Sequence, residues 1–192
     1  MIDDGASASN HHGAAVIGPS RIMIIRHAEK HAEPGVTVEG RSDEHSLTVR
    51  GWQRAGALVR LFGPDADVAL RPDVVYASAI GPESETRRPQ QTVGPLVDLM
   101  REHNDSMYDD RFLKPNVEAL VADVLERTGT VLIAWEHSRI PAIVAALPHA
   151  PAVPSEWPKD RYDLVWVLDR SGQGWDFRQI PQLLLSGDQH AS

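Results

Sequence analysis

Runs of consecutive apolar residues, separated by segments with helical spacing, organise most of the chain. Five segments predict strands: residues 21–26, 73–78, 130–135, 164–169 and, as a weaker pattern, 175–180. The first four are apolar at successive positions instead of alternating with polar residues. Such runs are typical of strands that are covered on both faces. We therefore expect a sheet with elements packed against both of its sides.

Between these segments, apolar residues recur at the three- and four-residue spacing of helices. We expect one helix after Thr48, a second over 86–102, a third from near Asn116 and a fourth after Ser138. Pro89 and Pro141 fit the first turns of the second and fourth helices, whereas Pro95 should kink the second helix or end it early. Alternating strands and helices predict an α/β fold, a three-layer α/β/α sandwich around a mainly parallel central sheet.

The length of 192 residues and the apolar content of 42% fit one globular domain. Neither an internal repeat nor a linker divides residues 21–192, so we expect a single domain there. Residues 1–20 are small and polar, and they predict a disordered N-terminal tail. The absence of any run of membrane length, and of a signal peptide with a basic start, makes the cytoplasm the expected location.

Charge and cysteine content narrow the possible partners and chemistry. The formal charge of −8 argues against nucleic acid or an anionic membrane as the main partner. Any phosphate site must then be a local cationic pocket in an acidic protein. The chain contains no cysteine, which excludes disulfides, thiolate catalysis and cysteine-based zinc sites.

Residues that could bind or attack a substrate directly follow three of the predicted strands. Arg26 and His27 end the first strand, "RRPQQT" with Arg88 follows the second, and His137 follows the third. In open α/β sheets, ligands bind beyond the carboxyl ends of the strands. His137 also precedes a predicted helix, whose first N–H groups favour anions. Two arginines and two histidines at these positions predict a pocket for an anion such as phosphate.

The ordered motifs resemble the histidine phosphatase superfamily, also called phosphoglycerate mutase-like. They are Arg26-His27-Ala28-Glu29, Leu47-Thr48 with Gly51, Arg88 four residues before Thr92, and a strand that ends before His137; they span roughly residues 21–150. The resemblance implies that His27 is the nucleophile that accepts the phosphoryl group. It also implies that Arg26, Arg88 and His137 bind the phosphoryl oxygens. Because the arginines and His137 supply the positive charge, we expect that no metal or other cofactor is required. Arg139 is a further candidate for substrate binding.

Three positions depart from the family pattern. Ala28 stands where the family usually has glycine, although the residue stays small. Glu136 precedes His137 and would repel a phosphate unless it is turned away or paired, with Arg139 as one possible partner. Ser138 stands where the acid-phosphatase branch places an aspartate directly after its second histidine, so the usual acid of that branch is missing.

A carboxylic acid is needed to protonate the leaving oxygen. The resemblance makes Glu118 the first choice, because the mutase-like branch places its acid in the region after the R-x-x-x-T motif. Glu118 also fits a purely structural role, that of a glutamate in the first turn of a helix. Glu136 and Glu29 are the alternatives.

The leading prediction is a metal-independent phosphomonoesterase that acts on a small phosphate monoester through a phosphohistidine intermediate. A phosphomutase is the alternative within enzymes, and an inactive phosphate-binding or scaffold protein is the alternative outside them. A zinc site built on His27 and His137 lacks a third ligand at an obvious spacing. Residues 151–192 carry no motif with a functional interpretation, and the substrate and oligomeric state are left open.

Overall fold

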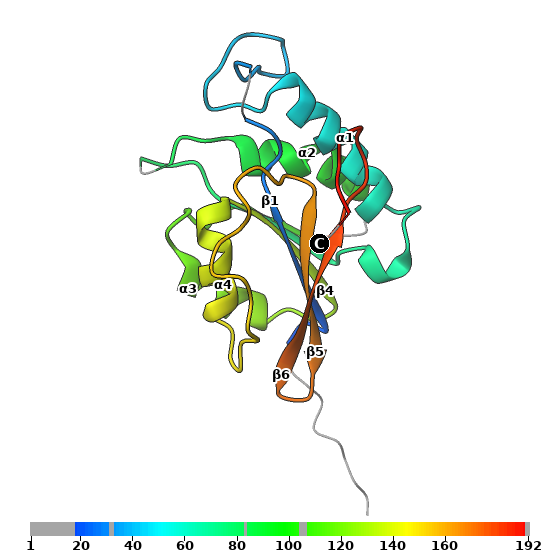
Figure 1. Cartoon of the computed structure of the whole chain (residues 1–192), viewed down its shortest axis with the longest axis vertical. Coiled ribbons are helices and arrows are strands. Elements are labelled where there is room, and N and C mark those ends of the chain that lie inside the picture. The colour runs from blue at the N-terminus through cyan, green and yellow to red at the C-terminus, as the bar shows by residue number, and fades with distance from the viewer. Residues whose placement is uncertain (1–17, 31–32, 83, 104–106, 191–192) are drawn as a thin grey trace, which may run out of the picture.

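The computed structural model describes residues 18–30, 33–82, 84–103 and 107–190. A six-stranded sheet forms the centre of the molecule (Figure 1), in the order β3-β2-β4-β1-β5-β6. The strands are β1 (Arg21–Arg26), β2 (Val74–Ala77), β3 (Met107–Asp109), β4 (Thr130–Trp135), β5 (Leu164–Ser171) and β6 (Gly174–Pro181). The predicted tail lies outside the described residues except for its last three. Among these, Ser20 donates its backbone N–H to Gly129 at 2.8 Å.

Four α-helices connect the strands, and the sequence predicts each of them. They are α1 (Val49–Phe62), α2 (Arg88–Glu102), α3 (Val117–Leu125) and α4 (Ile140–Ala145), with short 3₁₀ turns η1 (Val68–Leu70) and η2 (His137–Arg139). Thr48 caps α1, and its hydroxyl accepts the Gly51 N–H at 3.1 Å. Helix α2 runs through Pro95 to Glu102, so the proline does not end it early. None of the helices in the described ranges is long and apolar enough to cross a membrane.

The sheet is mixed, which corrects the prediction of a mainly parallel one. Strands β3, β2, β4 and β1 pair in parallel, whereas β5 pairs antiparallel with both β1 and β6. The two-residue turn Gly172-Gln173 joins β5 directly to β6 as a hairpin, which makes these two strands antiparallel. Gly172 has a φ of 57°, a conformation that glycine adopts without a steric penalty.

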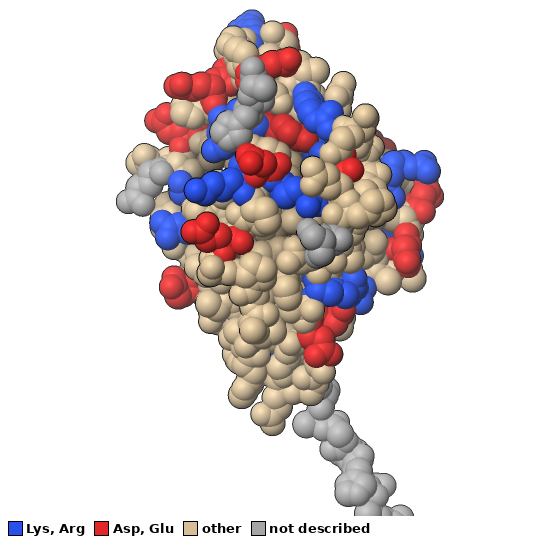
Figure 2. Space-filling view, in the orientation of Figure 1, with Lys and Arg blue, Asp and Glu red and all other residues tan. Residues whose placement is uncertain are grey.

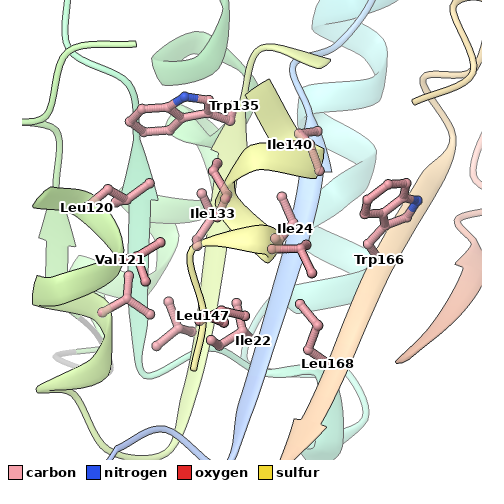
Figure 3. Close-up of a cluster of buried hydrophobic side chains, with 14 of the residues drawn as sticks. Ile22, Ile24, Leu120, Val121, Ile133, Trp135, Ile140, Leu147, Trp166 and Leu168 are labelled. Carbon is pink, nitrogen blue, oxygen red and sulfur yellow. The ribbon is translucent and has the colours of Figure 1, made fainter. Parts of the chain in front are cut away.

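Two large apolar clusters, one on each face of the sheet, form most of the core in the described ranges, and a small third cluster consists of Ala28, Leu47 and Ala55. Neighbouring residues of β1 point to opposite faces. Ile22 and Ile24 pack with α3 and α4 (Figure 3), whereas Met23 and Ile25 pack with α1 and α2. The buried positions of β1, β2, β4 and β5 are consecutive, as the apolar runs predict. The polar residues of the candidate site lie at the edge of the sheet that is formed by the carboxyl ends of β1 and β4.

Candidate active site

The backbone brings His27 and His137 to the same edge of the sheet. Strands β1 and β4 are parallel neighbours, and their last residues, Arg26 and Trp135, are register partners. The next residue, His27, donates its backbone N–H to the Trp135 carbonyl at 3.0 Å. Glu136 and His137 follow Trp135 directly. The register therefore places the ends of β1 and β4 side by side, as the sequence predicts.

The His27 imidazole is buried and neutral. Its side chain is 1% exposed, and its Nδ1 lies 2.8 Å from the Ala28 carbonyl oxygen. A carbonyl only accepts hydrogen bonds, so this contact assigns the proton to Nδ1 and leaves the lone pair on Nε2. Burial, helped by the positive charges of Arg26, Lys30 and Arg88, lowers the pKa of His27 from 6.5 to about 3. At neutral pH the ring is thus an uncharged base with one fixed orientation.

The guanidinium of Arg26 is held by the segment 159–162. It donates to the carbonyl of Lys159, to that of Arg161 at 3.5 Å and to the hydroxyl of Tyr162 at 3.1 Å. It also stacks 3.9 Å from the centroid of the Tyr162 ring, which itself lies 6.3 Å from the His27 ring. Burial lowers the pKa of Arg26. Its Nε is a buried donor with no hydrogen-bond partner among the described residues, which leaves it available to an incoming oxygen.

Arg88 begins α2 and reaches back to the loop before α1. Its Nε donates to the Ser46 carbonyl at 3.0 Å, and its terminal nitrogens donate to Thr86 and to the carbonyl of Glu44. Four residues on, the Thr92 hydroxyl accepts the Ala28 N–H at 2.8 Å and donates to the Arg88 carbonyl at 2.7 Å. The Arg-x-x-x-Thr pattern therefore ties the start of α2 to the loop after β1.

His137 is paired with its neighbour in the chain. Its Nδ1 lies 3.0 Å from a carboxylate oxygen of Glu136, and the other oxygen accepts the Ser138 hydroxyl. Burial opposes ionisation of Glu136, but Ser138, His137 and Lys114 outweigh it and lower the pKa of this carboxyl. The carboxylate thus engages its two neighbours, in contrast to the expected pairing with Arg139, whose side chain is exposed at the end of η2.

The other two candidate acids lie in different surroundings. Glu29 is buried, and one of its oxygens accepts two hydrogen bonds from Arg54, at 2.9 and 2.8 Å. The same guanidinium pairs with Asp188 at 2.7 Å, in the C-terminal segment that lies beside α1 (Figure 1). Glu118 is exposed on the first turn of α3 and lines a surface groove with Ala142 and other residues of α4. Glu118 thus lies in the groove beside α4, whereas Glu29 is engaged by Arg54.

The structure adds two residues to the candidate site that the sequence does not predict, Tyr162 and Lys30. Tyr162 contacts Arg26, as described above. Lys30 is half-buried, and its pKa is lowered by burial, by Arg88 and Arg26 and, more weakly, by Lys114, with Glu136 opposing. Such mutual effects require that these side chains share one locality. The position of Lys30 in the Arg-His-x-Glu segment is the one signal that could have pointed to it.

A cavity of about 300 Å³ adjoins His137. Its walls include Ser138, Ser155, Glu156 and the indole of Trp157. Trp157 is nearly buried and donates its Nε1–H to the Arg161 carbonyl at 2.9 Å, which fixes the segment that also holds Arg26. Within the described ranges, no group of three or more His, Asp or Glu side chains is placed to hold a metal ion.

No protein-family model and no curated protein matches the chain. Among solved structures, it is similar to the proposed phosphohistidine phosphatase SixA from Agrobacterium tumefaciens, at 24% identity and a TM-score of 0.47, over 83% of this chain and 96% of that one. It is also similar to a proposed alpha-ribazole-5'-phosphate phosphatase from Escherichia coli, at 18% identity and a TM-score of 0.49, over 84% and 96% of the two chains.

A third similar structure is the alpha-ribazole phosphatase from Shigella flexneri, at 18% identity and a TM-score of 0.47, over 82% of this chain and 94% of that one.

Proposed function

We propose that this protein is a phosphomonoesterase that uses His27 as its nucleophile. The observation that carries the proposal is the state of that ring. Nδ1–H is fixed on the Ala28 carbonyl, and the low pKa keeps Nε2 unprotonated. An imidazole in this state needs no base to activate it, because its lone pair is free at neutral pH.

Cationic side chains around His27 favour a dianionic substrate. Arg26 and Arg88 both lower the pKa of His27 through their charge, so both contribute positive potential at the ring. The unpartnered Nε of Arg26 supplies one donor. Arg88 and His137 are the proposed further ligands of the phosphoryl oxygens. Positive side chains of this kind spread the charge of the transition state, so the proposed mechanism requires no metal.

The reaction has two steps. Nε2 of His27 forms a bond to phosphorus as the ester P–O bond breaks, and the leaving oxygen takes a proton. Water then attacks the phosphohistidine, which releases inorganic phosphate and restores the neutral ring. The same group that gave the proton in the first step accepts one from the attacking water.

Glu136 is the carboxylate that we assign to this proton transfer. Its charge acts on both Arg26 and Lys30, whereas Glu29 is engaged by Arg54 and Glu118 lies in the groove beside α4. In the unliganded chain Glu136 is ionised. A bound phosphate dianion nearby raises the pKa of the carboxyl, so substrate binding itself favours the protonated form that the first step needs.

Trapping the phosphoenzyme tests the proposal. The wild-type protein, incubated with a ³²P-labelled monoester without added metal and quenched in denaturant, should carry a phosphoryl group that is stable in base and lost in acid. His27→Asn should lose both this label and the release of phosphate, because Asn has no nucleophilic nitrogen. His103→Asn is the matched control, since exposed His103 makes the same kind of bond, to the Leu99 carbonyl at 2.9 Å. Turnover that persists in His27→Asn would refute the assignment.

A further inference from the structure

The segment that holds Arg26 is itself fixed by one buried carboxylate. Asp163 is 4% exposed, and its two oxygens accept hydrogen bonds from the Arg161 guanidinium at 2.6 and 3.2 Å. The backbone carbonyl of Arg161 accepts the Trp157 indole N–H at 2.9 Å and lies 3.5 Å from a terminal nitrogen of Arg26. Arg161 therefore joins Asp163, through its side chain, to the guanidinium of the candidate site, through its backbone.

The C-terminal segment, residues 182–190, is tied to this ion pair at two points. Gln189 donates its backbone N–H to the Asp163 carboxylate at 2.8 Å, and its carbonyl accepts a hydrogen bond from Arg161 at 3.0 Å. Gln182, at the start of the segment, donates its backbone N–H to the Asp163 carbonyl at 2.7 Å. The side chain and the backbone of Asp163 thus both contact the segment.

Helix α1 holds the same segment through Asp188. This carboxylate accepts hydrogen bonds from the buried Arg54 at 2.7 and 3.1 Å, and from the backbone N–H groups of Leu184 and Leu185 at 2.8 and 3.0 Å. Burial opposes ionisation of Asp188, but Arg54 and the two N–H groups outweigh it and lower its pKa to about 2. Figure 2 shows charged side chains of both signs next to one another over the upper half of the molecule, where Figure 1 places α1.

The orientation of the Arg26 guanidinium depends on the segment that these contacts fix. Its terminal nitrogens donate to the carbonyls of Lys159 and Arg161 and to the hydroxyl of Tyr162, so all three acceptors come from residues 159–162. These bonds also aim Nε, the donor that is available to an incoming oxygen. An arginine that is already ordered in this way loses less conformational entropy when it binds an anion.

We propose that Asp163 and Arg161 are positioning residues, through which the C-terminal segment sets the orientation of Arg26 for binding the phosphoryl group. They act through Arg26 alone and take part in no chemical step. The inference rests on the proposed role of Arg26 as a ligand of the phosphoryl oxygens, and it adds the contacts that preorganise this ligand.

Equilibrium binding of inorganic phosphate, measured by calorimetry at fixed ionic strength, tests the proposal. Arg161→Met and Asp163→Asn should each weaken binding by about tenfold, the effect of one lost hydrogen bond to a charged group. Arg161→Lys keeps the charge and a single donor, so its affinity should lie between those of Arg161→Met and the wild type.

The sign of the two effects separates positioning from simple charge. Arg161→Met removes a positive charge and Asp163→Asn removes a negative one, so an effect of net charge would weaken phosphate binding in the first variant and strengthen it in the second. Weaker binding in both variants supports the positioning role. Tighter binding in Asp163→Asn, or unchanged binding in both variants, would overturn it.

Arg127→Met is the matched control for lost stability. Arg127 pairs with Asp123 at 2.6 Å, and the two side chains are 23% and 16% exposed, against 16% and 6% for Arg161 and Asp163. This pair lies beyond the end of α3, near the start of β4 and thus away from the candidate site. Arg127→Met should lower the free energy of unfolding in urea, as Arg161→Met does, but leave phosphate binding unchanged. An equal loss of affinity in the control would refute the positioning role.

A double-mutant cycle tests whether the effect passes through Arg26. In an Arg26→Lys background, Arg161→Met should change the phosphate Kd less than about twofold, because the guanidinium that it positions is gone. The same tenfold loss in both backgrounds would overturn the proposal, as would a wild-type protein that binds no phosphate.

The binding measurements involve no turnover, so they separate this inference from the proposed activity. If no ester is hydrolysed but the loss of affinity is present and depends on Arg26, the positioning role stands and the phosphatase assignment fails. If the wild-type protein hydrolyses esters and Arg161→Met binds phosphate as tightly as it does, the positioning role fails and the phosphatase assignment stands.

Discussion

The buried neutral state of His27 should make the protein lose stability as the pH falls below neutrality. In the unfolded chain this histidine takes up a proton as the pH falls through 6.5, whereas in the folded chain it does so only near pH 3. Between these values the unfolded state binds one more proton than the folded state. The folding free energy from this group is therefore fully present above pH 6.5 and is lost as the pH drops.

The size of this loss of stability follows from the shift of the His27 pKa. Each pH unit below 6.5 costs about 1.4 kcal/mol, so at pH 5 the loss from His27 is about 2 kcal/mol. That is a large part of the 5–15 kcal/mol that typically stabilises a domain. His27→Asn removes the titration and retains a side-chain amide that can donate to the Ala28 carbonyl, in place of Nδ1–H.

Urea unfolding of both proteins at pH 7.5, 6.0 and 5.0 measures this contribution. Other groups titrate in both proteins, so the difference between their free energies of unfolding isolates His27. The difference should shift in favour of His27→Asn by about 2 kcal/mol between pH 7.5 and 5.0. His103→Asn should follow the wild-type curve. A difference that is independent of pH would show that His27 titrates in the folded protein as it does in the unfolded chain, and it would refute the lowered pKa on which the proposal rests.

Two further predictions concern carboxylates. Glu136→Gln should slow hydrolysis of an alkyl phosphate by about 10²- to 10⁴-fold but that of p-nitrophenyl phosphate far less, because nitrophenolate leaves without a proton. Glu118→Gln should affect the rates on both substrates little. If a rate assay gave the opposite pattern, Glu118 and not Glu136 would be the proton donor. Arg54→Met should cost about 3–5 kcal/mol in urea unfolding, since it leaves the buried carboxylates of Glu29 and Asp188 without their partner; a cost below 1 kcal/mol would contradict this.

Local patterns predict most of the fold because each depends on nearby residues. The apolar runs locate four strands, and Thr48 and Asn116 mark helix starts. Strand β3 has no such pattern, since its three residues, Met107–Asp109, are exposed or half-buried and are held by pairing with β2. The residues of β5 also do not indicate whether this strand pairs parallel or antiparallel with its neighbours. A continuous apolar run shows that both faces are covered, and only the short turn at Gly172 indicates an antiparallel neighbour.

The site is predictable where it depends on strand ends and not where it depends on distant contacts. Arg26, His27 and His137 lie at the same edge of the sheet because the parallel neighbours β1 and β4 end together. The partners of the Arg26 guanidinium come from residues 159–162, which approach it through tertiary packing and carry no local pattern. The pairing of Glu29 with Arg54 and Asp188 is of the same kind. The sequence therefore suggests several acids, and only the packed structure shows the surroundings of each.

The central place of β1 has a consequence for how the chain folds in the cell. This strand is synthesised first, yet its neighbours β4 and β5 lie far behind it in sequence. At the usual rate of translation, roughly 5–20 s pass between the synthesis of β1 and that of β4, about a hundred residues later. During this interval the apolar segment Ile22–Ile25 has no strand to pair with. Exposed apolar segments of this kind favour aggregation and chaperone binding in general, and His27, next to this one, is positioned only after β4 has been synthesised.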